Sequence, residues 1–411
     1  EICQTGLFIC YLITWDFIMV LFKNKNIFII GLFIVGQIFG KGISKTSIFP
    51  AQGKHVHGSS IIEAPNGDFL ACWFYGSGER TANDVVIQGS RLKKGSSEWG
   101  SIFVMADTPD LPDCNPVLFI NENDELMLFW IAVRANGWEN SVLRYKISSD
   151  YLKPGAPNWD WQDIIILKPG EEFYNTIKKE FEANYTDPAW SEYALPYEKL
   201  IAEAALDMEK RQKGWMTRIH PITLSTGRIL LPLYSDGYNI SLIGISDDNG
   251  KTWTSSKPIV GFGPVQPALI EKNDGSIIAY MRDNGGSPYR ILVSESQDQG
   301  MSWTFATDSK ILNPGSSIDA IELKNGHWVM IYNDTEDSRS SWAVSLSKDE
   351  GKTWKWTRHI GVSHDKSESY SYPSMIQTKD GKIHISYSYR NQEGKTILHA
   401  SFNENWIKKG D

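Results

Sequence analysis

Short apolar runs alternate with turn residues along most of the chain after about residue 48. One phrase occurs six times: an apolar strand, a turn that contains Gly or Asp, and a second apolar strand. The six copies are HGSSIIEAPNGDFLACWF (57–74), NPVLFINENDELMLFWI (115–131), HPITLSTGRILLPLY (220–234), QPALIEKNDGSIIAYM (266–281), IDAIELKNGHWVMIY (318–332) and YPSMIQTKDGKIHISY (372–387). Runs of this length between turn residues predict β-hairpins. A third apolar strand follows most of them.

An eight-residue turn follows three of these third strands. Its copies SDDNGKTW, SQDQGMSW and SKDEGKTW start at Ser246, Ser296 and Ser347, and each reads Ser-x-Asp-x-Gly-x-(Ser/Thr)-Trp. The Asp side chain of such a turn accepts hydrogen bonds from nearby backbone N–H groups, and the Gly takes a conformation that other residues avoid. We therefore interpret the three Asp residues as scaffold and the Trp as the start of a fourth strand.

A four-stranded unit repeated six times predicts an all-β fold, a six-bladed β-propeller, because six sheets arranged radially can bury the faces that one sheet leaves exposed. We expect this domain over residues 48–411. Residues 160–215 break the period between blades two and three, and SEYALPYEKLIAEAALDMEKRQKG (191–214) within them has apolar residues at helical spacing. We expect a partly helical insert that either borders the binding face or packs on the side of the propeller.

The first 43 residues have a different pattern. Lys23 and Lys25 precede an apolar run from Ile27 to Phe39, which is the arrangement of a secretory signal. We expect upstream residues and a signal in 1–43, a secreted, periplasmic or cell-surface location, and membrane contact only through this segment if it is not cleaved. Cys72 and Cys114 follow it, and whether they pair stays open.

Charge and composition exclude some kinds of partner. The net charge of the 411 residues is −8, and acidic and basic residues are interspersed. No basic patch of the kind that binds nucleic acid is present, so we expect no nucleic-acid partner. No strong metal-ligand spacing occurs either, and we expect neither a metal nor a cofactor.

The three Ser-x-Asp-x-Gly-x-(Ser/Thr)-Trp turns on a six-fold meander resemble those of the sialidase superfamily, where they are called Asp-boxes or BNR repeats. The resemblance covers about residue 50 to the end of the chain. It implies a glycosidase site with three arginines on the sugar carboxylate, a Tyr nucleophile paired with a Glu, and an acid/base Asp. The same turn also occurs in other glycosidases and in non-enzymes.

Several positions of the family pattern have a counterpart here. Arg282 in IIAYMRDNGG resembles the second arginine, and Arg339 in EDSRSSWAVSLS resembles the third. Tyr372 in SYSYPSMIQTKDG resembles the nucleophile, with Tyr370 as the neighbouring alternative. The resemblance therefore implies that Arg282 and Arg339 bind substrate and that Tyr372 is catalytic.

Other positions depart from the pattern. His57 stands at the place of the first arginine, and Gln266 stands at the place of the Glu partner, where it cannot act as a base. Glu368 or Asp319 could replace that Glu. The loop after the first hairpin, where the acid/base Asp is expected, offers Glu79, Arg80 and Asp84.

The starts of the hairpins identify the site independently. Four begin with a polar residue followed by Pro, and the first has His57-Gly58 at the same place. Since the first strand of each propeller blade lines the central channel, we expect these residues to ring one mouth of it. The ring comprises His57, Asn115, His220, Gln266 and Tyr372.

Three functions fit this set of residues. Arginines favour an anionic ligand because a guanidinium fork matches a carboxylate. The first hypothesis is an exported sialidase-like glycoside hydrolase that releases a terminal acidic sugar from a glycan, with Tyr372 and Glu79 as catalytic residues. The second is a polysaccharide lyase acting on uronate-containing glycans, in which Tyr372, His57 or His220 moves the proton. The third is a propeller that only binds a glycan, with Asn115 and Gln266 among its contacts.

Overall fold

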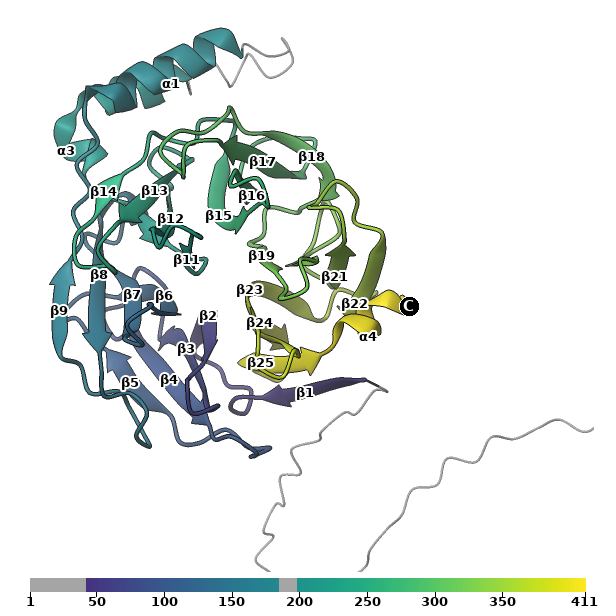
Figure 1. Ribbon diagram of the computed structural model, residues 1–411. Helices are drawn as coiled ribbons and strands as arrows, with labels where there is room; N and C mark the ends of the chain where they lie inside the picture. Colours follow the sequence, from purple (N-terminus) through teal and green to yellow (C-terminus); the bar gives the residue numbers. More distant parts are fainter. Residues whose placement is uncertain (1–41, 185–197) are drawn as a thin grey trace, which may run out of the picture. The chain divides into compact units, whose positions relative to one another are not determined.

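The computed structural model describes residues 42–184 and 198–411. Their strands form six antiparallel sheets arranged as the blades of a β-propeller, as the sequence predicted (Figure 1). In most blades the strands follow one another in chain order, with the first strand next to the central axis. This arrangement brings residues that are far apart in the sequence to one central site.

The first three blades are built from the segments before and after the insert. Blade one consists of β2 (His55–Glu63), β3 (Phe69–Gly76), β4 (Val86–Leu92) and β5 (Phe103–Ala106). Blade two consists of β6 (Asp113–Ile120), β7 (Leu126–Val133), β8 (Ser141–Ser148) and β9 (Trp161–Ile164). Blade three consists of β10 (Met216–Thr217), β11 (Ile222–Thr223), β12 (Ile229–Ser235), β13 (Ile240–Ser246) and β14 (Thr254–Ser255). The insert thus begins after β9, because 161–164 belong to blade two.

The remaining blades continue to the end of the chain. Blade four consists of β15 (Pro264–Glu271), β16 (Ile277–Asp283), β17 (Arg290–Ser296) and β18 (Thr307–Leu312). Blade five consists of β19 (Asp319–Glu322), β20 (Trp328–Tyr332), β21 (Ser341–Ser347) and β22 (Trp356–Val362). Blade six consists of β23 (Ser369–Gln377), β24 (Ile383–Asn391), β25 (Gly394–Phe402) and the strand β1 (Ile43–Ser47).

Strand β1 closes the ring. It pairs antiparallel with β25, with Ile43 opposite Phe402 and Ser47 opposite Leu398. The expected domain began at residue 48, and the structure adds β1 to it as the outer strand of the last blade. Closure of this kind covers the edge that β25 would otherwise expose and joins the two ends of the repeat array.

The first turn of every blade has the same backbone conformation. One residue in each turn has a positive φ, and these residues are Gly67, Asp124, Gly227, Gly275, Gly326 and Gly381. Glycine adopts this left-handed conformation without steric cost, and Asp is among the few other residues that tolerate it. The hairpin pattern of the sequence therefore corresponds to one repeated turn.

The three Asp-box turns have the predicted hydrogen bonds. Asp349 accepts hydrogen bonds from the Thr353 backbone N at 2.8 Å and the Thr353 Oγ1 at 2.7 Å. The Thr353 hydroxyl leads the contacts that hold the pKa of Asp349 below its ordinary value. Asp248 and Asp298 make the same pair of bonds to Thr252 and Ser302. Their interpretation as scaffold residues therefore agrees with the structure.

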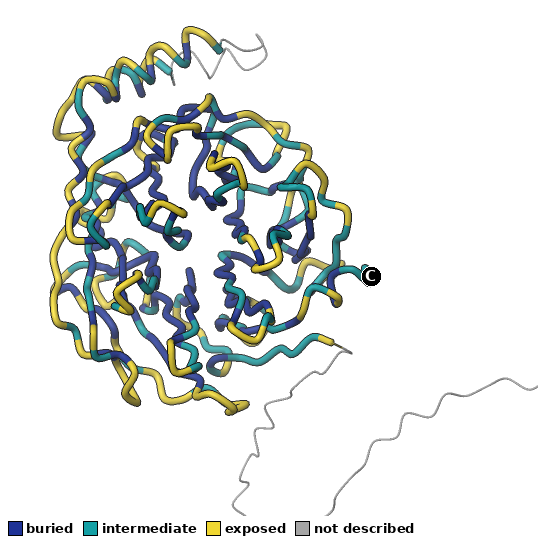
Figure 2. The backbone as a smooth tube through the Cα atoms, in the orientation of Figure 1, coloured by how far each residue is buried: buried dark blue, intermediate teal, exposed yellow. Residues whose placement is uncertain are grey.

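The hydrophobic core lies within and between the blades. Figure 2 shows buried backbone around the centre and exposed backbone at many of the outer loops. The largest fully buried side chains include Trp73, Trp130, Trp328 and Trp342. Cys72 and Cys114 are buried free thiols, so the two do not form a disulfide in this structure.

The described part of the insert packs against blade three. Helix α1 (Glu171–Ala183) buries Phe173, Ile177 and Phe181, which are four residues apart and share one face. The ring of Phe173 lies 5.2 Å from that of Tyr238, which lies between β12 and β13 of blade three. Residues 198–206 and α3 (Met208–Arg211) are helical within the predicted helical stretch, of which 191–197 lie outside the described residues. A short helix, α4 (Glu404–Lys408), lies outside the insert.

Candidate active site

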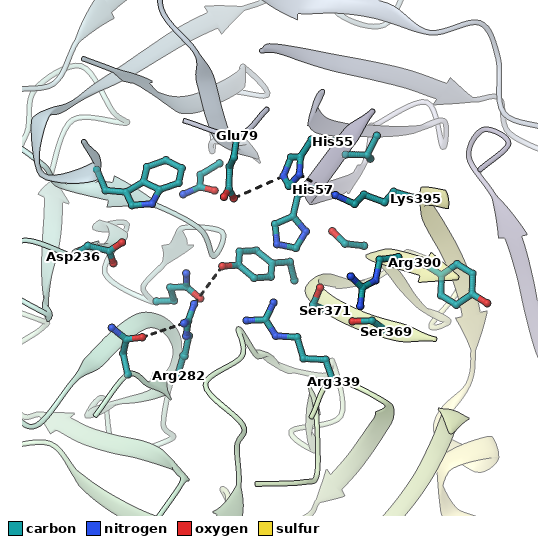
Figure 3. Close-up of a pocket in the computed structure, with 18 of the residues that line it drawn as sticks. His55, His57, Glu79, Asp236, Arg282, Arg339, Ser369, Ser371, Arg390 and Lys395 are labelled. Carbon is teal, nitrogen blue, oxygen red and sulfur yellow. Dashed lines mark hydrogen bonds and ion pairs between the residues drawn. The ribbon is translucent and has the colours of Figure 1, made fainter. Parts of the chain in front are cut away.

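A cavity of about 540 Å³ lies where the inner strands converge, and all six blades contribute to its walls (Figure 3). Seven of the eight residues expected at the site line it, and only His220 does not. The seven are His57, Glu79, Asn115, Gln266, Arg282, Arg339 and Tyr372. The propeller therefore gathers side chains that are more than 300 residues apart in the chain.

In each of four blades, a β-bulge in the inner strand sets the direction of the neighbouring side chains. The pairing register shifts between Cys114 and Val117, between Val265 and Ala268, and between Ser371 and Ser374. The first bulged residue has a positive φ in each case: 51° at Asn115, 59° at Gln266 and 55° at Tyr372. The second is Pro, which lacks an N–H and suits a break in the ladder. Three of the four residue-plus-Pro pairs of the sequence are thus bulges, and His220-Pro221 is the exception.

The bulge of blade one is shifted by one residue from the expected alignment. Its register changes between His57 and Ser60, and Gly58 has a φ of 61°. Gly58, rather than His57, therefore corresponds to Asn115, Gln266 and Tyr372. His57 is still paired with Phe74 and lies one position before the bulge.

His220 lies outside the cavity walls. Its Nε2 is 3.3 Å from Asp319 Oδ1, and its Nδ1 is 3.1 Å from the carbonyl oxygen of Pro221. Burial opposes its positive charge, but Asp319 raises the pKa of His220 above the ordinary value. Asp319 also accepts a hydrogen bond from the Met375 backbone N at 2.7 Å. Both residues therefore connect blades beneath the site.

Two arginines surround the phenol of Tyr372. Arg282 Nη1 donates to Tyr372 Oη at 3.3 Å, and its Nη2 donates to Asn284 Oδ1 at 3.0 Å. The guanidinium carbon of Arg339 lies 5.6 Å from the centroid of the Tyr372 ring. Two positive charges beside one hydroxyl group suit the binding of an anion next to a nucleophile or base.

A third arginine supports these residues from below. Arg218 is 2% exposed and lies 4.8 Å from the Tyr372 ring centroid. Its Nη1 and Nη2 donate to the carbonyl oxygens of Ser59 and Pro373 at 3.2 and 2.8 Å. These carbonyls belong to the bulges of blades one and six, so Arg218 fixes the bulge that presents Tyr372. Burial lowers the pKa of Arg218 to about 10, which leaves it charged at neutral pH.

His57 packs against Tyr372 as a neutral imidazole. The two ring centroids are 3.9 Å apart. Burial first, and then Arg339, hold the pKa of His57 well below its ordinary value. A neutral imidazole retains a lone pair, but the same burial and positive charge make His57 a weaker base than an ordinary histidine. Gln266, at the bulge of blade four, is 1% exposed and supplies an amide at the position where the family has a carboxylate.

Glu79 is the acidic residue of blade one in the cavity wall. Its Oε1 lies 3.8 Å from His55 Nε2, and burial raises the pKa of Glu79 above its ordinary value. Its neighbours Arg80 and Asp84 do not line the cavity. Arg80 Nε donates to the Asn136 carbonyl oxygen at 3.1 Å, and Asp84 accepts from Ser77 Oγ at 2.6 Å. Glu79 is therefore the residue of this loop that is suited to hold a proton for the site.

Glu368 and Tyr370 form a separate cluster. The hydroxyl groups of Tyr370 and Tyr389 both donate to the Glu368 carboxylate, the latter at 2.6 Å. Neither Glu368 nor Tyr370 lines the cavity. Of the two candidate tyrosines, Tyr372 is thus the one at the site.

Several residues of the site were not predicted from the sequence. Asp236 follows β12 and lines the cavity together with His55, Arg390 and Lys395. A signal existed for His55, which shares a strand face with His57 because the two are separated by one residue. A signal also existed for Arg218, a charged residue within the apolar stretch WMTRIHPI. No comparable signal marks Asp236, Arg390 or Lys395.

Neither a metal-binding cluster nor a membrane-spanning helix is found in residues 42–184 and 198–411. In this part of the chain, no group of three or more His, Cys, Asp or Glu side chains is placed to hold a metal ion. None of its helices is both long enough and apolar enough to cross a membrane.

The sequence matches one family and several sialidases. The family model of the BNR repeat-like domain matches residues 67–180 and 213–385. A sialidase from Micromonospora viridifaciens is 27% identical over 172 residues, which are 39% of this chain and 25% of that protein. An anhydrosialidase from Macrobdella decora is 24% identical over 200 residues, which are 43% of this chain and 25% of that protein. The chain thus spans about a quarter of the length of these relatives.

Solved structures share the fold at lower identity. A protein of unknown function from Dyadobacter fermentans has a TM-score of 0.65 and 16% identity, covering 88% of this chain and 99% of that chain. A leech intramolecular trans-sialidase complexed with 2,7-anhydro-Neu5Ac has a TM-score of 0.64 and 12% identity, covering 90% of this chain and 71% of that chain. These similarities support the six-bladed propeller architecture.

Proposed function

This chain belongs to the BNR repeat-like domain family, and from that membership we propose that it is a sialidase-like glycosidase that releases a terminal carboxylated sugar from a glycan. One observation carries the proposal: Arg282 Nη1 lies 3.3 Å from the Tyr372 hydroxyl, and Arg339 lies over the same ring. A carboxylate held by these two arginines positions its own sugar ring against Tyr372. Proximity and orientation of this kind account for much of an enzyme's rate advantage.

The proposed reaction needs a nucleophile, Tyr372, and an acid/base group, Glu79. Tyr372 Oη attacks the anomeric carbon, and Arg282, which donates a hydrogen bond to this oxygen, stabilises the phenolate charge. The phenol proton passes to the lone pair of the neutral His57 imidazole, which packs against the ring. Glu79 donates a proton to the leaving oxygen and then activates the water that releases the sugar. The raised pKa of Glu79 suits this role because the acid must hold its proton until the substrate is bound.

A lyase is the second candidate, and the amide of Gln266 favours it. A Tyr nucleophile of the family pattern is paired with a Glu, whereas Gln266 cannot act as a base. In a lyase, His57 or Tyr372 removes the proton next to a uronate carboxylate that Arg282 and Arg339 neutralise. The leaving group then departs with formation of a carbon–carbon double bond and without the addition of water.

Product analysis tests the proposal. The full chain is incubated with sialylated oligosaccharides and with oligosaccharides that carry a uronic acid either at the non-reducing end or inside the chain. In the internal uronic acid, the C4 oxygen carries the next sugar and can leave in an elimination. The products are separated and weighed by mass spectrometry. A hydrolase adds the mass of one water, and a lyase yields an unsaturated sugar that absorbs ultraviolet light. If the glycans bind without any product, the chain is a glycan-binding propeller and the enzymatic proposal fails.

We also propose that the chain is exported. The support is the order of Lys23, Lys25 and the apolar run Ile27–Phe39, which lie outside the described residues. Expression of the full sequence in a bacterial host, followed by mass spectrometry of the exported protein, tests this. A mature N-terminus between the apolar run and β1 agrees with cleavage, whereas intact protein confined to the cytoplasm contradicts export.

A further inference from the structure

The cavity contains more cationic groups than one carboxylate requires. Four basic side chains line it, Arg282, Arg339, Arg390 and Lys395, against two carboxyl groups, Glu79 and Asp236. Arg282 and Arg339 come from blades four and five and flank Tyr372. Arg390 and Lys395 come from the β24–β25 hairpin of blade six and form a second basic wall.

Arg390 is the exposed part of this wall. It follows Tyr389 at the end of β24 and is paired across the strand with Ser369. In the described residues, its guanidinium makes no hydrogen bond or ion pair within the chain. Figure 3 shows the side chain directed toward the cavity between Ser369 and Ser371. One guanidinium fork and two hydroxyl groups are a set of donors that matches the oxygens of an anion.

Lys395 adds a second charge, and among the residues that the structure describes no carboxylate forms an ion pair with it. Its Nζ lies 3.2 Å from His55 Nδ1, and the His55 imidazole lies between it and Glu79, whose Oε1 is 3.8 Å from His55 Nε2. Burial, and then Lys395 itself, lower the pKa of His55 to about 4, so the imidazole is neutral at neutral pH. Lys395 is therefore held in place by a neutral partner, and its ammonium group is in the wall of the cavity, where a ligand can contact it.

We infer that Arg390, Lys395, Ser369 and Ser371 form a second anion subsite, and that the substrate carries a further acidic group beyond the sugar held by Arg282 and Arg339. This inference rests on the proposed function, because it assigns the carboxylate of the reacting sugar to Arg282 and Arg339. The matching chemistry is a sulfate ester or a second carboxylate on the neighbouring part of the glycan. The chain would then prefer multiply acidic glycans to those with neutral neighbours.

Selenate, a heavy analogue of sulfate, is the first probe. Crystals of the full chain are soaked in sodium selenate, and anomalous scattering locates the anions. We expect one anion at Arg390, Lys395 and the two serines, and one at Arg282 and Arg339. The Arg390→Ala variant, changed at an exposed side chain, should lose only the first. Absence of an anion from the blade-six wall, or its persistence in Arg390→Ala, overturns the inference.

A pair of disaccharides then tests the link to substrate. Both disaccharides contain glucuronic acid, and only one of them carries a sulfate ester on the second sugar. A third disaccharide carries a carboxylate on the second sugar, so that binding through a sulfate can be distinguished from binding through a carboxylate. Calorimetry uses the Tyr372→Phe background to prevent turnover. We expect the disaccharide with the second anionic group to bind about tenfold more tightly than the one without it. Arg390→Ala should abolish this difference in affinity, and Arg390→Lys should keep part of it. Equal affinities in the Tyr372→Phe chain with Arg390 intact contradict the inference even if selenate binds.

Lys93→Ala is the matched control, because Lys93 is an exposed basic residue of blade one outside the cavity. It should leave the affinity difference unchanged. If Lys93→Ala reduces the difference as much as Arg390→Ala does, the preference reflects overall charge, and the subsite is rejected. If no disaccharide binds but selenate occupies only the blade-six wall, the subsite stands and the carboxylate site at Arg282 and Arg339 fails.

Discussion

Two repeated motifs of this propeller, the Asp-box turns and the inner-strand bulges, differ in what they repeat. The Asp-box turns repeat their side chains: Asp248, Asp298 and Asp349 each accept hydrogen bonds from the residue four positions later. The bulges repeat only their backbone. Gly58, Asn115, Gln266 and Tyr372 share a positive φ and a register shift, yet they are four different residue types.

This difference separates structural from functional repetition. In the Asp-box turns, the side chain and the backbone satisfy each other, so the same residues recur wherever the turn does. At the bulges, the strained backbone only aims a side chain into the cavity, and the residue is free to vary with its chemical role. A non-glycine residue in the left-handed region costs about 1–3 kcal/mol, which is expected at a functional site.

The largest expected effect is at the bulge of blade six. Tyr372→Phe removes one hydroxyl group and almost no volume, so the glycan should still bind. If Tyr372 is the nucleophile, turnover should fall by roughly a thousandfold or more, because the covalent step is lost. Steady-state kinetics on a carboxylated glycoside, together with calorimetric binding, measures both quantities.

The neighbouring Tyr370 is the control for this substitution. Its hydroxyl binds Glu368 and lies outside the cavity. Tyr370→Phe should therefore retain most of the turnover. If Tyr372→Phe keeps full turnover while His57→Ala abolishes it, the tyrosine-nucleophile mechanism is wrong, and the histidine-based lyase becomes the better account.

The next effect concerns the proton donor. Glu79→Gln keeps the shape of the side chain but cannot donate a proton, and turnover should fall roughly a hundredfold or more. The acid works in its protonated form, and burial raises the pKa of Glu79, so activity should persist above the ordinary range of a carboxyl group and decline as the pH rises through that pKa. The pH–rate profile of Glu79→Gln should lack this decline. A profile identical to that of the parent chain would remove Glu79 from the mechanism.

The arginines should have a moderate effect on binding. Arg282→Ala or Arg339→Ala removes a charge-assisted contact worth about 1.5–3 kcal/mol, which corresponds to a ten- to hundredfold loss of affinity for a carboxylated sugar. Arg→Lys should restore only part of the loss, because an ammonium group cannot form the bidentate fork. Calorimetry with the sugar acid and its methyl ester tests the assignment. Equal losses for the acid and the ester would show that these arginines do not bind the carboxylate.

The smallest effect on activity is expected at an Asp-box turn. Asp298→Ala removes the hydrogen bonds to Ser302 and should lower the free energy of unfolding by about 1–2 kcal/mol. The turnover of the folded protein should be unchanged, because no Asp-box residue lines the cavity. Denaturant unfolding and kinetics on the same preparation compare the two. Normal stability together with lost activity would reverse the roles assigned to turns and bulges.

The six-bladed architecture could be predicted from the sequence because short local patterns determine each hairpin and each Asp-box turn. Each hairpin places its turn residue and apolar strands within about twenty residues, and the Asp-box adds its own internal hydrogen bonds. The fourth strand of blade six was not predicted. Its residues Ile43–Ser47 pair with β25, which is separated from them by nearly the whole length of the sequence. Long-range pairing of this kind leaves no local signal.

The site was predicted where it coincides with the bulges, and missed elsewhere. Pro116, Pro267 and Pro373 mark bulges in the sequence, whereas Ser59 does not, which explains the one-residue misalignment at His57. Arg390 and Lys395 lie on the hairpin between β24 and β25, the two middle strands of blade six, and reach the cavity through long side chains. Their position depends on how blades one and six meet, and one sequence contains no direct measure of that geometry.

A structure of the chain with an acidic sugar bound tests the central claim most directly. Crystals soaked with N-acetylneuraminic acid, or in parallel with glucuronic acid, should show the carboxylate within hydrogen-bonding distance of both Arg282 and Arg339, with the sugar ring next to Tyr372. A sugar bound outside the central cavity, or with its carboxylate turned away from both arginines, would contradict the account.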